Sequence, residues 1–161
     1  MTEIRAARPD ELDAVAELVV RAYVGGGLVA ADSTYIHELR DTATRARQAE
    51  LLVAVDGDRL LGTVTFCPHG SPYAELAKHG EADFRMLAVD PDARGLGVGR
   101  LLVEECLERT RAGGYAPLRL STTLTMHAAH RLYERMGFTR TPELDWSPNP
   151  DVPLITYARK P

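Results

Sequence analysis

The sequence predicts an α/β (α+β) fold in which a mixed β-sheet is flanked by helices, and three observations carry that prediction. Segments with strand character alternate with segments whose apolar residues recur at helical spacing. The turn Asp56-Gly57-Asp58 joins two apolar runs and is a strong hairpin signal, which indicates an early antiparallel pair. A glycine-rich loop then connects an apolar strand to an amphipathic helix, as in folds that layer helices on a sheet.

The first elements alternate between strand and helix. A short strand is expected at residues 3–6, followed by a helix in which apolar residues recur at Leu12, Val15, Leu18 and Val19. We expect Asp10 to be the N-cap of this helix and the run of three glycines at residues 25–27 to end it. A second helix is expected from Ser33 to about Gln48, with its many Arg and Thr side chains exposed.

The remaining chain is expected to complete the sheet. On the predicted strand 82–89, strict alternation would place Asp83, Arg85, Leu87 and Val89 on one face. The proline-rich segment 142–150 is unsuited to central pairing and is expected to be a surface loop. The expected strands are 51–55, 60–66, 82–89, 117–122, 138–141 and 153–159; the expected helices begin near Val98 and near Met126, and residues 68–80 form a polar loop.

Length and composition predict one soluble domain spanning residues 1–161. Of these residues 45% are hydrophobic, which is enough for a substantial core. The sequence shows neither a secretory leader nor a long apolar run, so we expect a cytoplasmic protein without a membrane partner. Cys67 and Cys106 lack the spacing of a metal site or a disulfide framework, and both are expected to be reduced core residues, with no metal bound.

The charge of the chain narrows the choice of partners. A net charge of −4 and the lack of a long basic run argue against nucleic-acid binding. If the chain is an enzyme, its net negative charge weakly favours a cationic amine as substrate. The basic residues are overwhelmingly Arg rather than Lys, which suggests a GC-rich bacterial genome.

The loop after the predicted strand 82–89 has the properties of a phosphate cradle. The strand stops at Asp90-Pro91 and the helix begins near Val98, which leaves backbone N–H groups without partners. Gly95, Gly97 and Gly99 allow a large anion to approach the backbone, and the helix dipole favours it. Arg94 and Arg100 add positive charge at the rim.

Four interpretations of this loop compete. A dinucleotide-binding turn requires G-x-G-x-x-G near the first strand, whereas the glycines here are spaced G-x-G-x-G more than halfway along. A nucleoside-triphosphatase loop requires Lys and Ser or Thr after its last glycine, but Arg100 and Leu101 follow Gly99. A tight turn without a ligand is the structural alternative. The remaining pattern is Arg94-x-x-Gly97-x-Gly99.

That pattern resembles the loop of the GCN5-related N-acetyltransferases (GNAT), which holds the pyrophosphate of acetyl-coenzyme A. The segment 126–138 is similar to the second motif of the same family, a helix that ends in Leu-Tyr-Glu-x-x-Gly-Phe. The resemblance is specific over residues 82–138 and elsewhere rests on element order. It implies a mostly antiparallel sheet of six or seven strands with about four helices, in which the fourth and fifth strands splay apart to admit the coenzyme.

The resemblance also implies roles for individual residues. Main-chain groups of Leu87, Ala88 and Val89 would bind the pantetheine arm, with one N–H facing the thioester oxygen. Tyr133 would be the general acid that protonates the leaving thiolate. The family often has Asn where this chain has Met126, so one contact is missing or is made by backbone. The residues that would hold the pyrophosphate are Arg94, Gly95, Leu96, Gly97, Val98, Gly99 and Arg100.

The general base is left open among several candidates. Many relatives carry an acidic residue at the position of Asp83, and Glu81 lies two residues earlier on the same face. His127 and His130, at the start of the tyrosine helix, titrate in a suitable range. A base is also unnecessary if the amine arrives partly deprotonated or loses its proton through water.

The function implied is direct transfer of acetyl from acetyl-CoA to a primary amine, on a small molecule, in a ternary complex. Alternatives are a noncatalytic acyl-CoA sensor, an enzyme acting on protein amines or an oxygen acceptor, and one using another acyl donor. The acceptor and the choice between monomer and homodimer are left open. Several aromatic or polar-tipped residues lie in regions that usually contact the acceptor in this fold, although surface packing explains them equally well. They are Tyr23, Tyr35, His37, Tyr73 and Trp146.

Overall fold

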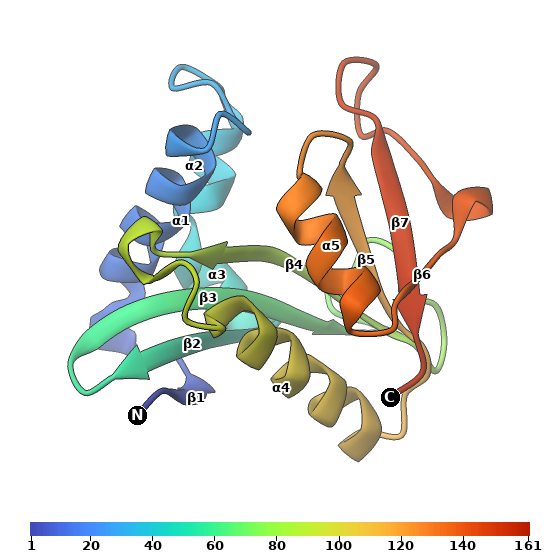
Figure 1. Cartoon of the computed structure of the whole chain (residues 1–161), viewed down its shortest axis with the longest axis horizontal. Coiled ribbons are helices and arrows are strands. Elements are labelled where there is room, and N and C mark those ends of the chain that lie inside the picture. The colour runs from blue at the N-terminus through green and yellow to red at the C-terminus, as the bar shows by residue number, and fades with distance from the viewer.

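A seven-stranded mixed sheet runs through the computed structural model, which describes residues 1–161 (Figure 1). The strand order is β1-β2-β3-β4-β5-β7-β6, and every neighbouring pair is antiparallel except β4 and β5. This confirms the expected mixed, mostly antiparallel sheet. The strands are β1 (Glu3–Ala6), β2 (Glu50–Asp56), β3 (Arg59–Pro68), β4 (Ala82–Val89), β5 (Leu118–Thr123), β6 (Thr139–Arg140) and β7 (Leu154–Arg159).

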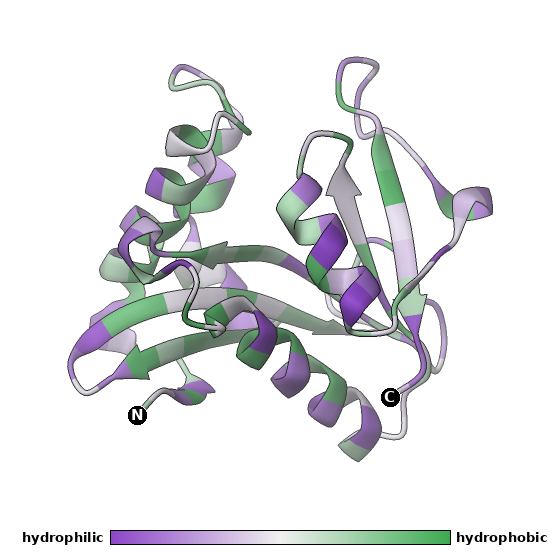
Figure 2. Ribbon diagram, in the orientation of Figure 1, coloured by the Kyte–Doolittle hydropathy of each residue, from purple (hydrophilic) through white to green (hydrophobic).

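Helices cover both faces of the sheet. The helices are α1 (Leu12–Gly25), α2 (Tyr35–Arg40), α3 (Thr42–Gln48), α4 (Val98–Ala112) and α5 (His127–Arg135). Strand β2 shows why two layers form, because Leu51 and Val53 pack in the cluster with α1 whereas Leu52 and Ala54 pack in the cluster with α4. In Figure 2 the central strands are largely hydrophobic, whereas hydrophilic and hydrophobic residues alternate along α4 and α5. No helix is long and apolar enough to cross a membrane.

Two expectations about the first helices are wrong. Asp10 is not a cap: it lies in a 3-10 turn, Pro9–Glu11, and the Glu11 carboxylate instead accepts the Arg8 backbone N–H at 2.8 Å. The helix expected from residue 33 to 48 is split at Asp41, whose backbone leaves the helical region and whose side chain accepts the Thr44 N–H. This split makes five helices instead of about four.

The expected exposure of that second helix is also wrong for its central arginine. Arg45 is fully buried, and its guanidinium donates to the carbonyl oxygens of Glu38 and Leu39 at 2.7 and 2.9 Å. Those carbonyls belong to the last turn of α2, where no following helical turn supplies N–H donors. Arg45 therefore supplies the donors that the break at Asp41 removes.

Strand β4 contains a bulge that overturns the expected alternation. Thr63 of β3 pairs with Ala88 and Thr65 pairs with Arg85, so two residues of β4 lie opposite one of β3. Met86 has φ = 57°, which accommodates the extra residue. As a result Leu87 packs against the α4 cluster, on the opposite face from Arg85.

Beyond the bulge, β4 and β5 part. Their parallel pairing covers only Ala82–Phe84 against Leu118–Leu120. The remaining residues of the two strands diverge, and α5 lies in front of the opening (Figure 1). The splay implied by the family resemblance is therefore present, and it opens at the end of the sheet where α4 begins.

Candidate functional site

The glycine loop that the sequence predicts to be a phosphate cradle lies at the start of α4. Gly97 is the N-cap with φ = 78° and ψ = 15°, a left-handed conformation that favours glycine. The first bond of the helix runs from the Leu101 N–H to the Gly97 oxygen, so the N–H groups of Val98, Gly99 and Arg100 find no acceptor in the helix. A fifteen-residue helix that begins with free N–H donors fits a pyrophosphate.

Strand β3 brings this helix close to the sheet. A Cβ on Gly62 would lie 2.9 Å from the Ala88 oxygen and 2.9 Å from Val98 Cγ1. The missing side chain lets the first turn of α4 rest directly on β3 and β4. On the other side, a Cβ on Gly99 would lie 3.4 Å from Leu132 Cδ2, so α4 also approaches α5 closely.

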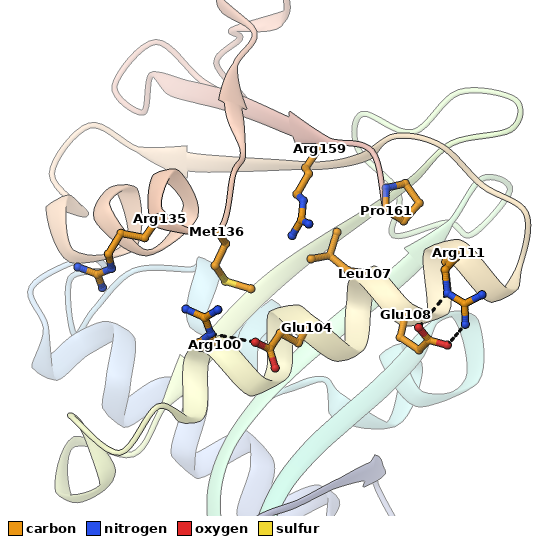
Figure 3. A pocket seen from close by; sticks show the side chains of 9 residues that line it. All are labelled: Arg100, Glu104, Leu107, Glu108, Arg111, Arg135, Met136, Arg159 and Pro161. Atoms are coloured by element: carbon orange, nitrogen blue, oxygen red, sulfur yellow. Dashed lines mark hydrogen bonds and ion pairs between the residues drawn. The ribbon is translucent and has the colours of Figure 1, made fainter.

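The two arginines of the loop have different surroundings. Arg94 is exposed at the cradle. Arg100 pairs instead with Glu104 at 2.8 Å and lines an open groove of about 480 Å³ between α4 and the ends of α5 and β7 (Figure 3). The groove carries more positive than negative side chains: its charged residues are Arg100, Glu104, Glu108, Arg111, Arg135 and Arg159.

A second, narrower cavity of about 40 Å³ lies where β4 and β5 part. It is lined from α1, β4, β5 and α5 by Tyr23, Phe84, Arg85, Met86, Leu87, Ser121, Thr122, Met126 and Tyr133. Met126, the N-cap of α5, and Tyr133 of the same helix thus line one cavity. Leu87 is the predicted pantetheine residue on its wall, and Ala88 and Val89 follow it along β4 toward the cradle.

Tyr133 is the buried phenol of this cavity. Its side chain packs against the rings of Phe84, Phe138 and Tyr157 at 5.9–6.0 Å between centroids, and its residue is 4% exposed. Burial raises the pKa of Tyr133, and no hydrogen bond within the protein acts on its hydroxyl. The phenol is therefore protonated throughout the neutral range and is free to donate into the cavity.

Asp83 holds a loop rather than lining the cavity. Its Oδ2 accepts the backbone N–H groups of Glu75, Leu76 and Ala77 at 2.9, 2.7 and 2.9 Å, and Oδ1 is buried without a partner. Burial raises the pKa of Asp83, although the three donors oppose that rise. The loop between β3 and β4 is thereby fixed to the start of β4.

The other base candidates also have partners within the protein. Glu81 forms a two-pronged ion pair with Arg119, both contacts at 3.0 Å, and the Arg119 hydrogen bond lowers the pKa of Glu81. His130 Nε2 lies 2.8 Å from the Thr123 carbonyl oxygen, and His127 is exposed beside it.

The sequence interpretation missed a polar cluster around Arg85. Its guanidinium lies 3.3 Å from Tyr35 Oη and from Glu38 Oε1 and 3.6 Å from Glu75 Oε1, with the Tyr73 ring beneath it at 5.7 Å. The aromatic residues singled out in the acceptor regions thus converge here, apart from His37 and Trp146. The only sequence signal was an arginine within an apolar strand.

Trp146 supports the opposite wall of the cavity. Its indole N–H donates to Ser121 Oγ at 3.0 Å, which leaves the Ser121 hydroxyl proton available to the cavity. The segment 142–150 is a loop, as expected, with one isolated bridge between Trp146 and Leu154.

Comparison with known proteins places the chain among acetyltransferases. The Acetyltransferase (GNAT) family matches residues 12–138. An IAA acetyltransferase of Azospirillum brasilense is 31% identical over 165 residues, covering 100% of this chain and 99% of its own. A mycothiol acetyltransferase of Geodermatophilus obscurus is 37% identical over 102 residues, covering 63% of this chain, and this chain spans only 32% of the length of that relative.

Solved structures share the fold. The acetyltransferase yncA of Salmonella typhimurium, described as putative and solved with acetyl-CoA, superposes with a TM-score of 0.72 at 20% identity, covering 99% of this chain and 93% of its own. At this identity the likeness concerns the fold alone.

Proposed function

The chain belongs to the GNAT acetyltransferase family, and on that premise we propose that it transfers the acetyl group of acetyl-CoA to a primary amine of a small molecule, directly and within a ternary complex. One observation carries the proposal above all. Tyr133 lines a cavity between the splayed strands and its hydroxyl has no hydrogen-bond partner within the protein, while its helix, α5, approaches the start of α4 with its free N–H groups.

The cradle and the splay together suit acetyl-CoA. In this proposal the N–H groups of Val98, Gly99 and Arg100 hold the pyrophosphate, with Arg94 beside them. The pantetheine arm follows β4 beyond Phe84, where the backbone edge of Leu87 to Val89 that faces β5 has no strand partner. The nucleotide end extends toward the Arg100 end of the groove in Figure 3, where positive charge is in excess.

The transfer step then needs two proton movements. The amine nitrogen bonds to the acetyl carbon, the carbon–sulfur bond breaks, and its electron pair leaves with sulfur. Tyr133 gives its proton to that sulfur and regains one from solvent, while the nitrogen loses a proton. Because the phenol is a weak acid, it can protonate the thiolate efficiently only if its hydroxyl contacts the sulfur.

We propose that Glu75 accepts the proton that the amine nitrogen loses. The Asp83 carboxylate already accepts three backbone N–H groups of the loop, so we give it the role of positioning that loop. Glu75 lies on the same loop and contacts Arg85 of the cavity wall. Burial raises the pKa of Glu75, which makes it a better proton acceptor than an exposed carboxylate.

The test is a panel of primary amines incubated with acetyl-CoA, with released thiol and product mass as readouts. The proposal expects thiol release that depends on an amine and a product heavier by one acetyl group on nitrogen. Tight coenzyme binding with no transfer to any amine would favour a noncatalytic sensor instead. Acetylation of a hydroxyl would identify an oxygen acceptor.

A further inference from the structure

Arg85 is the one charged residue among the nine that line the cavity between β4 and β5. Its side chain is 16% exposed, and the transfer chemistry assigned to Tyr133 and Glu75 gives its charge no task. A buried guanidinium at the wall of a reaction cavity is costly unless it is well bonded.

The bonds of Arg85 are longer than those of comparable arginines. Its three hydrogen bonds measure 3.3, 3.3 and 3.5 Å, and its buried Nε has no hydrogen-bond partner. Arg119, equally exposed on the neighbouring strand, holds Glu81 with two bonds of 3.0 Å. Arg5 holds Glu11 with two bonds of 2.8 Å. Arg85 also contacts Glu75 at 3.6 Å and the Tyr73 ring, but unlike Arg119 and Arg5 it holds no carboxylate in a two-pronged pair.

From this contrast we propose that Arg85 binds a carboxylate of the acceptor, so that the acceptor is an amino acid or a compound with an amine and a carboxylate on the same carbon. This inference rests on the proposed function and names its substrate class. A guanidinium binds a carboxylate through parallel N–H donors, and the long contacts of Arg85 leave N–H groups available for such a carboxylate.

The residues around Arg85 suit the ammonium group of such an acceptor. Glu38 and Glu75 flank the guanidinium, so the cluster of three carries one excess negative charge. An acceptor with only a carboxylate would be repelled by these groups, whereas an amino acid brings an ammonium group as well. Binding the carboxylate at Arg85 places the adjacent nitrogen beside Glu75, the assigned proton acceptor, and within the cavity that Tyr133 lines.

The experiment compares amino acids with their decarboxylated amines, such as leucine with isopentylamine and phenylalanine with phenethylamine. The ratio of kcat/KM within each pair is measured with acetyl-CoA for the wild type and for Arg85→Gln, Arg85→Lys and Arg119→Gln. We expect the wild type to prefer the amino acid by about tenfold or more, because hydrogen bonds to charged groups are strong. Arg85→Gln should abolish that preference and Arg85→Lys should reduce it.

Arg119→Gln is the matched control, since it removes an equally exposed guanidinium outside the cavity and should retain the preference. Thermal unfolding of each variant checks that the ratios come from folded protein. Equal use of both members of each pair by the wild type, or a preference that survives Arg85→Gln, would overturn the inference while leaving amine acetylation intact. Absence of thiol release with every amine would instead defeat the proposed function.

Discussion

The Asp83 carboxylate accepts the backbone N–H of Leu76 at 2.7 Å, the shortest of three such bonds that tie the β3–β4 loop to the start of β4. This bond fixes the β3–β4 loop, which carries Glu75, through a residue that does not line the cavity. In the proposed mechanism Asp83 therefore positions the loop, and Glu75 takes part in proton transfer.

Asp83→Ala should loosen that loop. Three charge-assisted bonds disappear from a buried site, so we expect a loss of about 2–4 kcal/mol in the free energy of unfolding. KM for the amine should rise more than the dissociation constant of the coenzyme. Glu11→Ala is the control, because it also removes a carboxylate that accepts a backbone N–H but lies at the far end of the sheet. Equal effects on both ligands would contradict the positioning role.

Glu75→Gln should change the pH profile rather than the fold. Burial raises the pKa of Glu75, and the group must be ionised to accept a proton. Wild-type kcat/KM should therefore fall as the pH drops through that raised pKa. The Gln variant should lose this acidic limb and run about 10–100-fold slower at its plateau. An unaltered limb in the variant would assign the titration to another group.

Tyr133→Phe should reduce kcat by about 100-fold, since a general acid contributes on that order. Coenzyme affinity, measured by calorimetry, should stay close to that of the wild type. Tyr157→Phe is the matched control, because the Tyr157 hydroxyl donates to Glu134 at 2.8 Å and is absent from the cavity lining. Undiminished turnover in the Tyr133 variant would remove the acid assignment.

Gly97→Val and Gly99→Leu should weaken coenzyme binding by about tenfold or more, because each places carbon beside donors that the pyrophosphate needs. Gly57→Val provides the comparison for Gly97, since Gly57 also has a positive φ, 60°, but lies in the distant β2–β3 turn. Both valine variants should lose stability, yet only the cradle variant should lose affinity. Calorimetry that finds equal affinity in all three would move the cradle elsewhere.

The Arg5–Glu11 pair should make stability depend on acidic pH. The hydrogen bonds from Arg5 lower the pKa of Glu11 to about 2. A pKa below its unfolded value adds stability that is present above about pH 4.5 and is lost as the pH falls toward 2, by about 1–2 kcal/mol after solvent screening. Urea unfolding should show the gap between wild type and Glu11→Gln closing over that interval. A constant gap would contradict the linkage.

Local patterns correctly predicted the strand Ala82–Val89 and a helix that begins at Val98. The apolar strand, the glycines and the amphipathic helix act over short range, so the amino-acid sequence alone is sufficient to predict this strand-loop-helix, and its binding of a pyrophosphate stays a prediction. The break at Asp41 was visible in principle, because Asp41 followed by Thr42 and Thr44 is a helix start signal. The helical periodicity on both sides concealed it.

The bulge at Met86 was not predictable from the strand itself. The run from Phe84 to Val89 is apolar enough to satisfy either register, and pairing with β3 chooses between them. The contacts of Arg85 were hidden for a related reason. Its partners come from residues 35, 38, 73 and 75, which only the folded topology brings to one place.

The extra residue in β4 separates two side chains that strict alternation would place on one face. Arg85 contacts Glu38 of α2, whereas Leu87 packs in the cluster with α4. If Arg85 binds the acceptor as proposed, substitutions at residue 85 should change which compounds are acetylated and leave donor binding unchanged. In a scaffold where one strand serves both reactants, that partition lets recognition of one evolve without loss of the other.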